Sequence, residues 1–115
     1  MKLEELYAVI GGDFHQTVER FGGNERLIKL ITLFLEDQSI ELLKNSIERK
    51  EWREAFRISH NIKGTAMNLS FPDLYEVSVK LTDALRSEEE LQDMDLYFNV
   101  LKEYNRTKQI IRKFV

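Results

Sequence analysis

Apolar residues recur at helical spacing along most of the chain. Residues 24–49 place apolar side chains on one broad face of a single long helix that Asn24 could cap. Residues 51–69 repeat apolar positions at intervals of three and four, which predicts a second long helix. Two shorter helices are predicted before these, one over residues 2–10 and one from Asp13, as its N-cap, to Phe21. No stretch alternates with period two long enough to predict a strand, so the predicted fold class is all-α.

Two further helices are predicted in the second half of the chain. Ser70 with Asp73, and Ser87 with Glu90, have the spacing of a capping box, and Pro72 suits a first helical turn. Four long amphipathic helices joined by short connections predict an antiparallel four-helix bundle, with a short N-terminal helical extension covering one end. A chain of 115 residues suits one compact domain, so a single domain over residues 1–115 is expected.

Composition narrows the classes of function. Apolar residues make up 43% of the chain and charged residues 32%, as in soluble globular proteins. The net charge is −3 with both signs interspersed, which argues against nucleic acid as a partner. There are no cysteines, and the longest apolar run, residues 27–35, is too short to span a membrane. A monomeric cytoplasmic protein without membrane contact is therefore expected.

The residues around His60 form the candidate site. Ile58 and Ile62 each lie about 160° from His60 around the helix axis, so the imidazole is predicted to face away from the core. Its neighbours within about 60° on the same face are Arg53, Phe56, Arg57, Lys63, Gly64 and Met67.

Gly64 and Lys63 suggest chemistry at this face. A glycine inside a helix costs about 1 kcal/mol relative to alanine, and at i+4 a side chain would crowd the imidazole, so Gly64 is predicted to give access to it. The Lys63 ammonium at i+3 suits phosphate oxygens, and a neutral imidazole has a nitrogen lone pair for attack. On the pattern alone, a solvated histidine with a tolerated glycine is an equal alternative, because so short a motif occurs often by chance.

The same residues resemble those of the histidine phosphotransfer (HPt) domains of two-component phosphorelays. The likeness runs from "RFGGNERLIKLITLFLED" through "EWREAFRISHNIKGTAMNLS" to "LYEVSVKLTDALR", and "SHNIKGTAMNLS" is similar to the family motif A-H-x-L-K-G-x-A-x-x-L-G. The resemblance implies that His60 accepts a phosphoryl group from a receiver-domain aspartyl phosphate and passes it to another receiver. It implies that Lys63 stabilises the phosphoryl charge and that Gly64 gives access. The chain would then be a covalent carrier and not a kinase.

The sequence departs from the family pattern at two positions. Ser70 stands where the family frequently has glycine, a change that looks harmless if Ser70 caps the next helix. Thr82 stands 22 residues after His60, where family members often have Gln or Glu to orient the imidazole or meet the phosphoryl group. Because a threonine side chain is too short for that task, we do not assign it to Thr82.

Partners and alternatives follow from this resemblance. The expected partners are response-regulator receiver domains and a sensor or hybrid histidine kinase, docking at Phe56, Met67, Arg53 and Arg57. For Phe56 and Met67, packing at the edge of the core is an equal alternative. The acids lie along solvated helix faces, so no metal or cofactor site is predicted in the chain and Mg²⁺ is expected from the receiver. Two alternatives stay open: the phosphoacceptor domain of a chemotaxis-type or hybrid kinase, or a helical scaffold or inhibitor that carries no phosphate. His15 lacks such a motif and is expected to be an ordinary helical residue.

Overall fold

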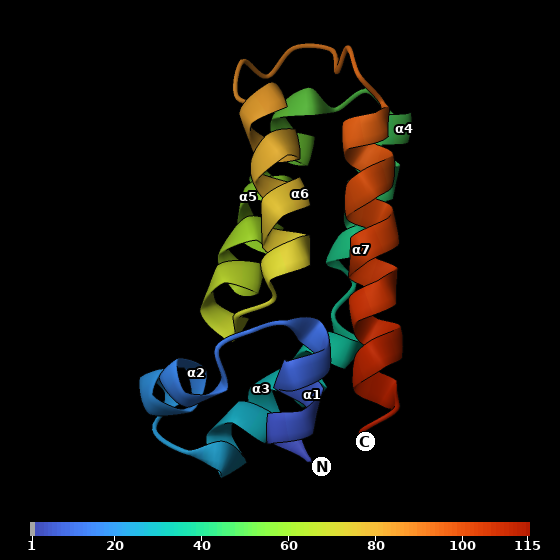
Figure 1. The fold of residues 1–115 in the computed structure, drawn as a ribbon. Helices are drawn as coiled ribbons and strands as arrows, with labels where there is room; N and C mark the ends of the chain where they lie inside the picture. The colour runs from blue at the N-terminus through green and yellow to red at the C-terminus, as the bar shows by residue number, and fades with distance from the viewer. Residues whose placement is uncertain (1) are drawn as a thin grey trace.

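The computed structural model describes residues 2–115, and these residues form helices joined by loops and contain no strand. The all-α prediction is therefore confirmed. The helices in chain order are α1 (Leu3–Ile10), α2 (Phe14–Phe21), α3 (Asn24–Glu36), α4 (Ser39–Glu48), α5 (Trp52–Leu69), α6 (Pro72–Ala84) and α7 (Asp95–Arg112) (Figure 1). Among them, no helix is both long enough and apolar enough to cross a membrane.

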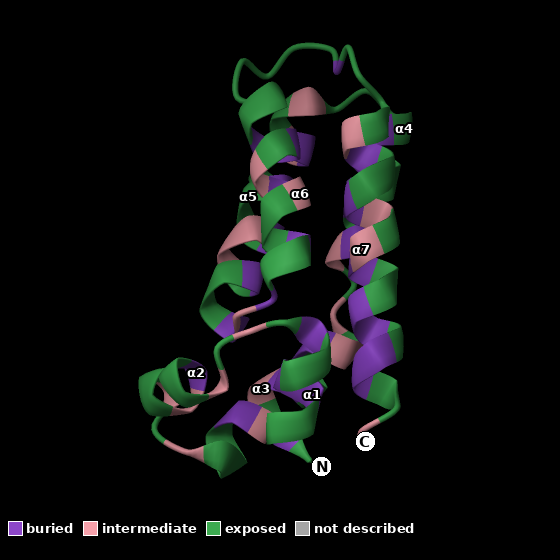
Figure 2. Ribbon diagram, viewed as in Figure 1, coloured by how far each residue is buried: buried purple, intermediate pink, exposed green. Residues whose placement is uncertain are grey.

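The helices α4 to α7 form a bundle around one apolar core. α5 packs along α6, α6 packs against α7, and α4 packs against α5. A short turn reverses the chain between α5 and α6, so these two helices run in opposite directions (Figure 1). Buried positions recur along each helix on the side that faces its neighbours (Figure 2). The apolar positions predicted for residues 51–69, namely Ala55, Ile58, Ile62, Ala66 and Leu69, are all buried.

The predicted long helix over residues 24–49 is wrong in one respect, because the chain leaves the helix at Asp37. The Asp37 backbone is extended, with ψ 136°. Its carbonyl oxygen accepts a hydrogen bond of 2.7 Å from the buried Lys108 ammonium, and its carboxylate accepts one from the Tyr104 hydroxyl. Contacts with α7 thus stabilise a break that the apolar period does not indicate. Leu42, which a single helix over residues 24–49 would place on the apolar face, is 54% exposed because α4 starts a new helical phase.

Three predicted helix caps are also wrong. Gly23, not Asn24, precedes α3, and no side chain caps that end. Phe71 precedes α6, and no side chain caps that end either. The last helix begins at Asp95, well after Ser87, and its first amide donates to the Asp93 carboxylate at 3.0 Å. A capping pattern is a local signal, and at these three positions it does not indicate the residue at which the helix begins. The predicted Asp13 cap of α2 is confirmed, because its carboxylate accepts from the Gln16 amide.

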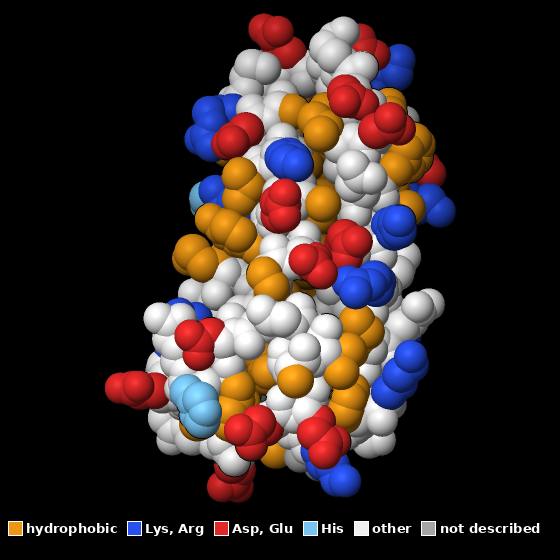
Figure 3. Space-filling model, in the orientation of Figure 1, with side chains coloured by type: hydrophobic (Ala, Val, Ile, Leu, Met, Phe, Trp, Pro, Cys, Tyr) orange, Lys and Arg blue, Asp and Glu red, His pale blue; other side chains and the backbone are white. Residues whose placement is uncertain are grey.

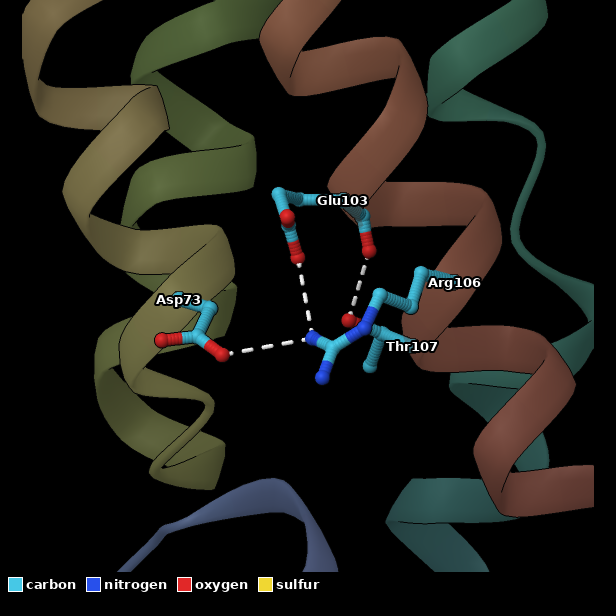
Figure 4. A network of polar contacts seen from close by, with 4 residues as sticks. All are labelled: Asp73, Glu103, Arg106 and Thr107. Carbon is cyan, nitrogen blue, oxygen red and sulfur yellow. Dashed lines mark hydrogen bonds and ion pairs between the residues drawn. The ribbon is translucent and has the colours of Figure 1, made fainter.

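A surface ion pair between Arg106 and Asp73 connects α7 to α6, and Glu103 of α7 joins it. The Arg106 guanidinium lies between the carboxylates of Asp73, at 3.2 Å, and Glu103, at 3.1 Å (Figure 4). The Thr107 hydroxyl donates to the Glu103 carbonyl at 2.7 Å. These bonds raise the pKa of Arg106, the Glu103 hydrogen bond most of all. Exposed pairs of this kind contribute little stability, so the apolar core holds the two helices together.

The first two helices cover the C-terminal end of α5. The Tyr7 hydroxyl donates to the Leu69 carbonyl at 2.7 Å, and the Arg20 guanidinium donates to the Asn68 carbonyl at 2.6 Å. The last four carbonyls of a helix have no partner within it, so α1 and α2 supply partners that α5 lacks. Both contacts join residues far apart in the chain and set where α5 ends relative to the N-terminal helices.

Ser70 takes part in the contact between α5 and the N-terminal helices, and the prediction that it caps α6 is wrong. It ends α5 in the left-handed conformation, with φ 59°, and its hydroxyl accepts a hydrogen bond of 2.8 Å from the Asp13 amide. Gly12 approaches the same residue so closely that a Cβ there would lie 2.0 Å from the Ser70 carbonyl oxygen. The serine therefore links α5 to the start of α2.

Candidate functional site

His60 projects from the middle of α5 into solvent. Its neighbours in the chain and on the inner face, Ser59 and Ile62, are buried at 0% and 3% exposure. The position of the imidazole thus follows from the amphipathic period of α5, which places Ile62 in the core and His60 outside it. A nitrogen of this ring can be reached by a group on another molecule.

Lys63 and Gly64 lie one turn further along α5 on the same face. Both are half-buried, and among residues 2–115 no carboxylate lies within ion-pairing distance of the Lys63 ammonium. A Cβ added at Gly64 would meet no atom within 4 Å. The expectation that a side chain there would crowd the imidazole is therefore wrong for the unmodified ring, because the imidazole does not point toward Gly64. The space above Gly64 is open to an added group or a partner.

A groove of about 530 Å³ extends from His60 toward the start of α5. Arg57 donates two hydrogen bonds to Glu54 in this groove, one of them from Nε at 3.1 Å. These bonds hold the pKa of the Glu54 carboxyl below its usual value. The Arg57 charge is thus partly matched within α5. The residues that line the groove are Glu51, Trp52, Arg53, Glu54, Phe56, Arg57, His60 and Glu88.

The imidazole of His60 has an aromatic neighbour. The Phe56 ring lies one turn before it, with the two ring centroids 6.1 Å apart and the ring planes inclined by 24°. The Arg86 guanidinium, in the turn that follows α6, lies 5.9 Å from the Phe56 ring centroid. Arg86 also donates to the Asp83 carboxylate at 2.8 Å.

Thr82 does not belong to this face. It is fully buried between α5 and α6, and its hydroxyl forms a hydrogen bond of 2.7 Å with the hydroxyl of Ser59. The sequence left open whether Thr82 could orient the imidazole. It cannot do so directly, because α6 directs its side chain toward the core and not toward the imidazole. Its neighbour in the interface, Ser78, is also buried, and its hydroxyl has no hydrogen-bond partner.

Comparison with protein families identifies the family to which this chain belongs. The family model described as Hpt domain matches residues 29–109, a span that contains α4, α5 and α6 and most of α3 and α7. The chain belongs to the Hpt-domain family. Histidine phosphotransfer in two-component signalling is the activity of this family, whose members are phosphocarriers. Searches for similar curated proteins and similar solved structures gave no match.

The Hpt domain exposes apolar side chains on the same side as His60. Met67 is 54% exposed two turns after the histidine, and Tyr75 is 37% exposed at the start of α6. Figure 3 shows hydrophobic side chains gathered at the left edge of the molecule, over α5 and α6. Arg53 and Arg57 are exposed at the other end of this face. Apolar contact beside charged groups is the usual composition of a protein interface.

Three residues at the site of this Hpt domain were not among the site residues predicted from the sequence. Arg86 and Glu88 lie more than twenty residues from His60 in the chain, and only the packing of α6 on α5 brings them to it. Trp52 is half-buried at the edge of the core and also lines the groove. No periodic signal could have identified Arg86 and Glu88, because their contacts join different elements, whereas Trp52 lies on α5 itself.

Acidic and histidine side chains are dispersed over the Hpt domain. Within the described part of the chain, residues 2–115, no three His, Cys, Asp or Glu side chains gather as a metal site requires. His15 lies on α2, and its ring packs against Phe14 with the centroids 5.3 Å apart.

Proposed function

We propose that His60 carries the phosphoryl group of this Hpt domain, within an antiparallel four-helix bundle formed by α4 to α7 in one domain. The observation that supports this most is the exposure of the imidazole in the middle of the helix that also carries the family motif. His15 lacks that motif.

The proposed reaction is transfer between a receiver aspartate and His60. The lone pair of an imidazole nitrogen attacks phosphorus, an N–P bond forms, and the P–O bond of the acyl phosphate breaks. The electron pair of that bond goes to the aspartate, which leaves as a carboxylate. Transfer to the next receiver runs the same step in reverse.

Lys63 and Gly64 take supporting roles in this proposal. The phosphoryl group brings close to two negative charges, and the Lys63 ammonium lies one turn away without a carboxylate partner among residues 2–115. Gly64 leaves open the space that a phosphoryl group or the receiver surface would enter.

Receiver domains and a histidine kinase are the proposed partners, and the surface around His60 is the proposed docking site. Met67 would supply apolar contact, and Arg53 and Arg57 would supply charge at the edge. Phe56 belongs to the same face but exposes only part of its ring. We expect the receiver to bring Mg²⁺, because transfer depends on charge neutralisation and a metal ion supplies part of it.

The test uses a receiver domain phosphorylated at its aspartate, with Mg²⁺. Wild-type protein is expected to gain label that is labile to acid and stable to base, as phosphohistidine is. The His60→Gln variant is expected to gain none, whereas the matched His15→Gln variant is expected to be labelled as the wild type is. Label that persists in His60→Gln would contradict the assignment.

The alternatives predict other outcomes of the same experiment. A phosphoacceptor domain of a chemotaxis-type kinase would be labelled by a kinase core with ATP and poorly by receivers. A scaffold or inhibitor that binds a receiver would give no label while still forming a complex.

A further inference from the structure

The Phe56 ring lies beside the His60 imidazole and can restrict its rotation. Phe56 is half-buried and packs against the apolar core, whereas His60 is exposed. Their rings are nearly parallel, and their centroid separation of 6.1 Å lies within the range of offset-stacked aromatic pairs. A ring anchored in the core therefore borders a ring that would otherwise turn freely in solvent.

A second contact fixes the Phe56 ring itself. The Arg86 guanidinium lies 5.9 Å from its centroid, within the range of a cation–π interaction, and the Asp83 carboxylate holds the same guanidinium. Arg86 belongs to the turn after α6, so this contact links α6 to the histidine helix without a hydrogen bond to the imidazole. Thr82, which is fully buried against Ser59, cannot make that link.

We propose that Phe56 is a positioning residue, which keeps the His60 imidazole in the orientation needed for attack, and that Arg86 acts through Phe56. This inference rests on the proposed function of His60 and assigns Phe56 a role beyond contact with a partner. A stacked pair loses rotational freedom before the receiver arrives, which favours transfer in the same way as any pre-oriented nucleophile.

The first experiment observes the imidazole in the unphosphorylated protein by NMR. The ring current of Phe56 displaces the imidazole proton signals of His60. Phe56→Leu, which keeps an apolar side chain but removes the ring, is expected to move these signals toward those of free histidine. Phe56→Tyr keeps the ring and is expected to preserve them. Arg86→Met, at an exposed position that should not affect folding, is expected to move them in the same direction by less.

The second experiment measures phosphotransfer from a phosphorylated receiver over a range of receiver concentrations. Phe56→Leu is expected to lower the rate at saturating receiver about two- to tenfold, the worth of one aromatic pair, with the half-saturating concentration unchanged. Phe56→Tyr is expected to restore the rate. Met67→Ala, at a docking position, is expected to raise the half-saturating concentration instead.

Two results would overturn the inference. One is unchanged His60 signals in both Phe56→Leu and Arg86→Met. The other is a Phe56→Leu variant in which only the half-saturating concentration changes, as expected of a docking contact. Wild-type protein that a receiver never labels would instead contradict the proposed function, and the imidazole signals would still report whether Phe56 holds the ring.

Discussion

Two glycines of this Hpt domain, Gly12 and Gly64, differ in how much space surrounds them. Gly12 is required by packing, because a Cβ there would lie 2.0 Å from the Ser70 carbonyl oxygen and 2.9 Å from the Tyr7 ring. Gly64 is not required by packing, because a Cβ there would meet nothing within 4 Å. The fold does not need a glycine at this position of the helix, which supports the access role proposed for Gly64.

We predict opposite changes in stability for alanine at these positions. Gly64→Ala should raise the free energy of unfolding by about 0.5 to 1 kcal/mol, since alanine restricts the unfolded chain and favours helix. It should also slow phosphotransfer from a receiver. Gly12→Ala should lower the free energy of unfolding, because backbone atoms must shift. Urea unfolding and receiver-dependent labelling measure both quantities.

Thr65→Ala, at an exposed position next to Gly64 in α5, is the control for the transfer assay. Its transfer rate should equal that of the wild type. A Gly64→Ala variant that transfers phosphoryl groups at the wild-type rate would show that the access role of Gly64 is wrong.

At the scale of elements, α5 is held at its C-terminal end by side chains of the N-terminal helices. Tyr7 contacts the Leu69 carbonyl, Arg20 contacts the Asn68 carbonyl, and the Ser70 hydroxyl accepts the Asp13 amide. The helix that carries His60 packs against α4 and α6 and is covered at its C-terminal end by these side chains. A rigid helix would keep His60, the proposed acceptor, in place for the partners proposed above.

We predict that Tyr7→Phe lowers the free energy of unfolding by about 1 kcal/mol, the usual worth of one hydrogen bond. The variant keeps the ring in the core and removes only the hydroxyl that donates to Leu69. Tyr75→Phe, at an exposed tyrosine on α6, is the matched control and should leave stability unchanged. Equal effects of the two substitutions in urea unfolding would contradict the role of this contact.

At the scale of the whole molecule, two buried tyrosines connect distant parts of the chain. Burial raises the pKa of Tyr7, and burial together with the nearby Asp37 carboxylate raises the pKa of Tyr104. Tyr7 joins α1 to the end of α5, and Tyr104 joins α7 to the break between α3 and α4. The folded protein therefore keeps both phenols protonated at a pH where the unfolded chain loses its protons.

We predict that the free energy of unfolding falls as the pH rises above about 10, the value for an unfolded tyrosine. A group whose pKa is raised by folding contributes its stability below the unfolded pKa and loses it above that value. The slope from each such tyrosine approaches about 1.4 kcal/mol per pH unit. In urea unfolding at a series of alkaline pH values, Tyr7→Phe should show a shallower fall than the wild type. Parallel curves for the two proteins would contradict this prediction.

The sequence by itself determined most of the helices and the outward position of His60. The period of α5 correctly assigns Ile58 and Ile62 to the core and His60 to the surface, because every i+3 and i+4 relation lies within one helix. The family motif is likewise local, so the predicted site residues on α5 could be named without coordinates.

Only the tertiary structure decided where helices end and what reaches the site from elsewhere. The break at Asp37 depends on Lys108 and Tyr104, and the left-handed Ser70 depends on Asp13. The place of Arg86 beside Phe56, and of Thr82 away from His60, depends on how α6 packs on α5. Each of these contacts joins residues more than twenty positions apart, beyond the few residues over which helical periodicity carries information.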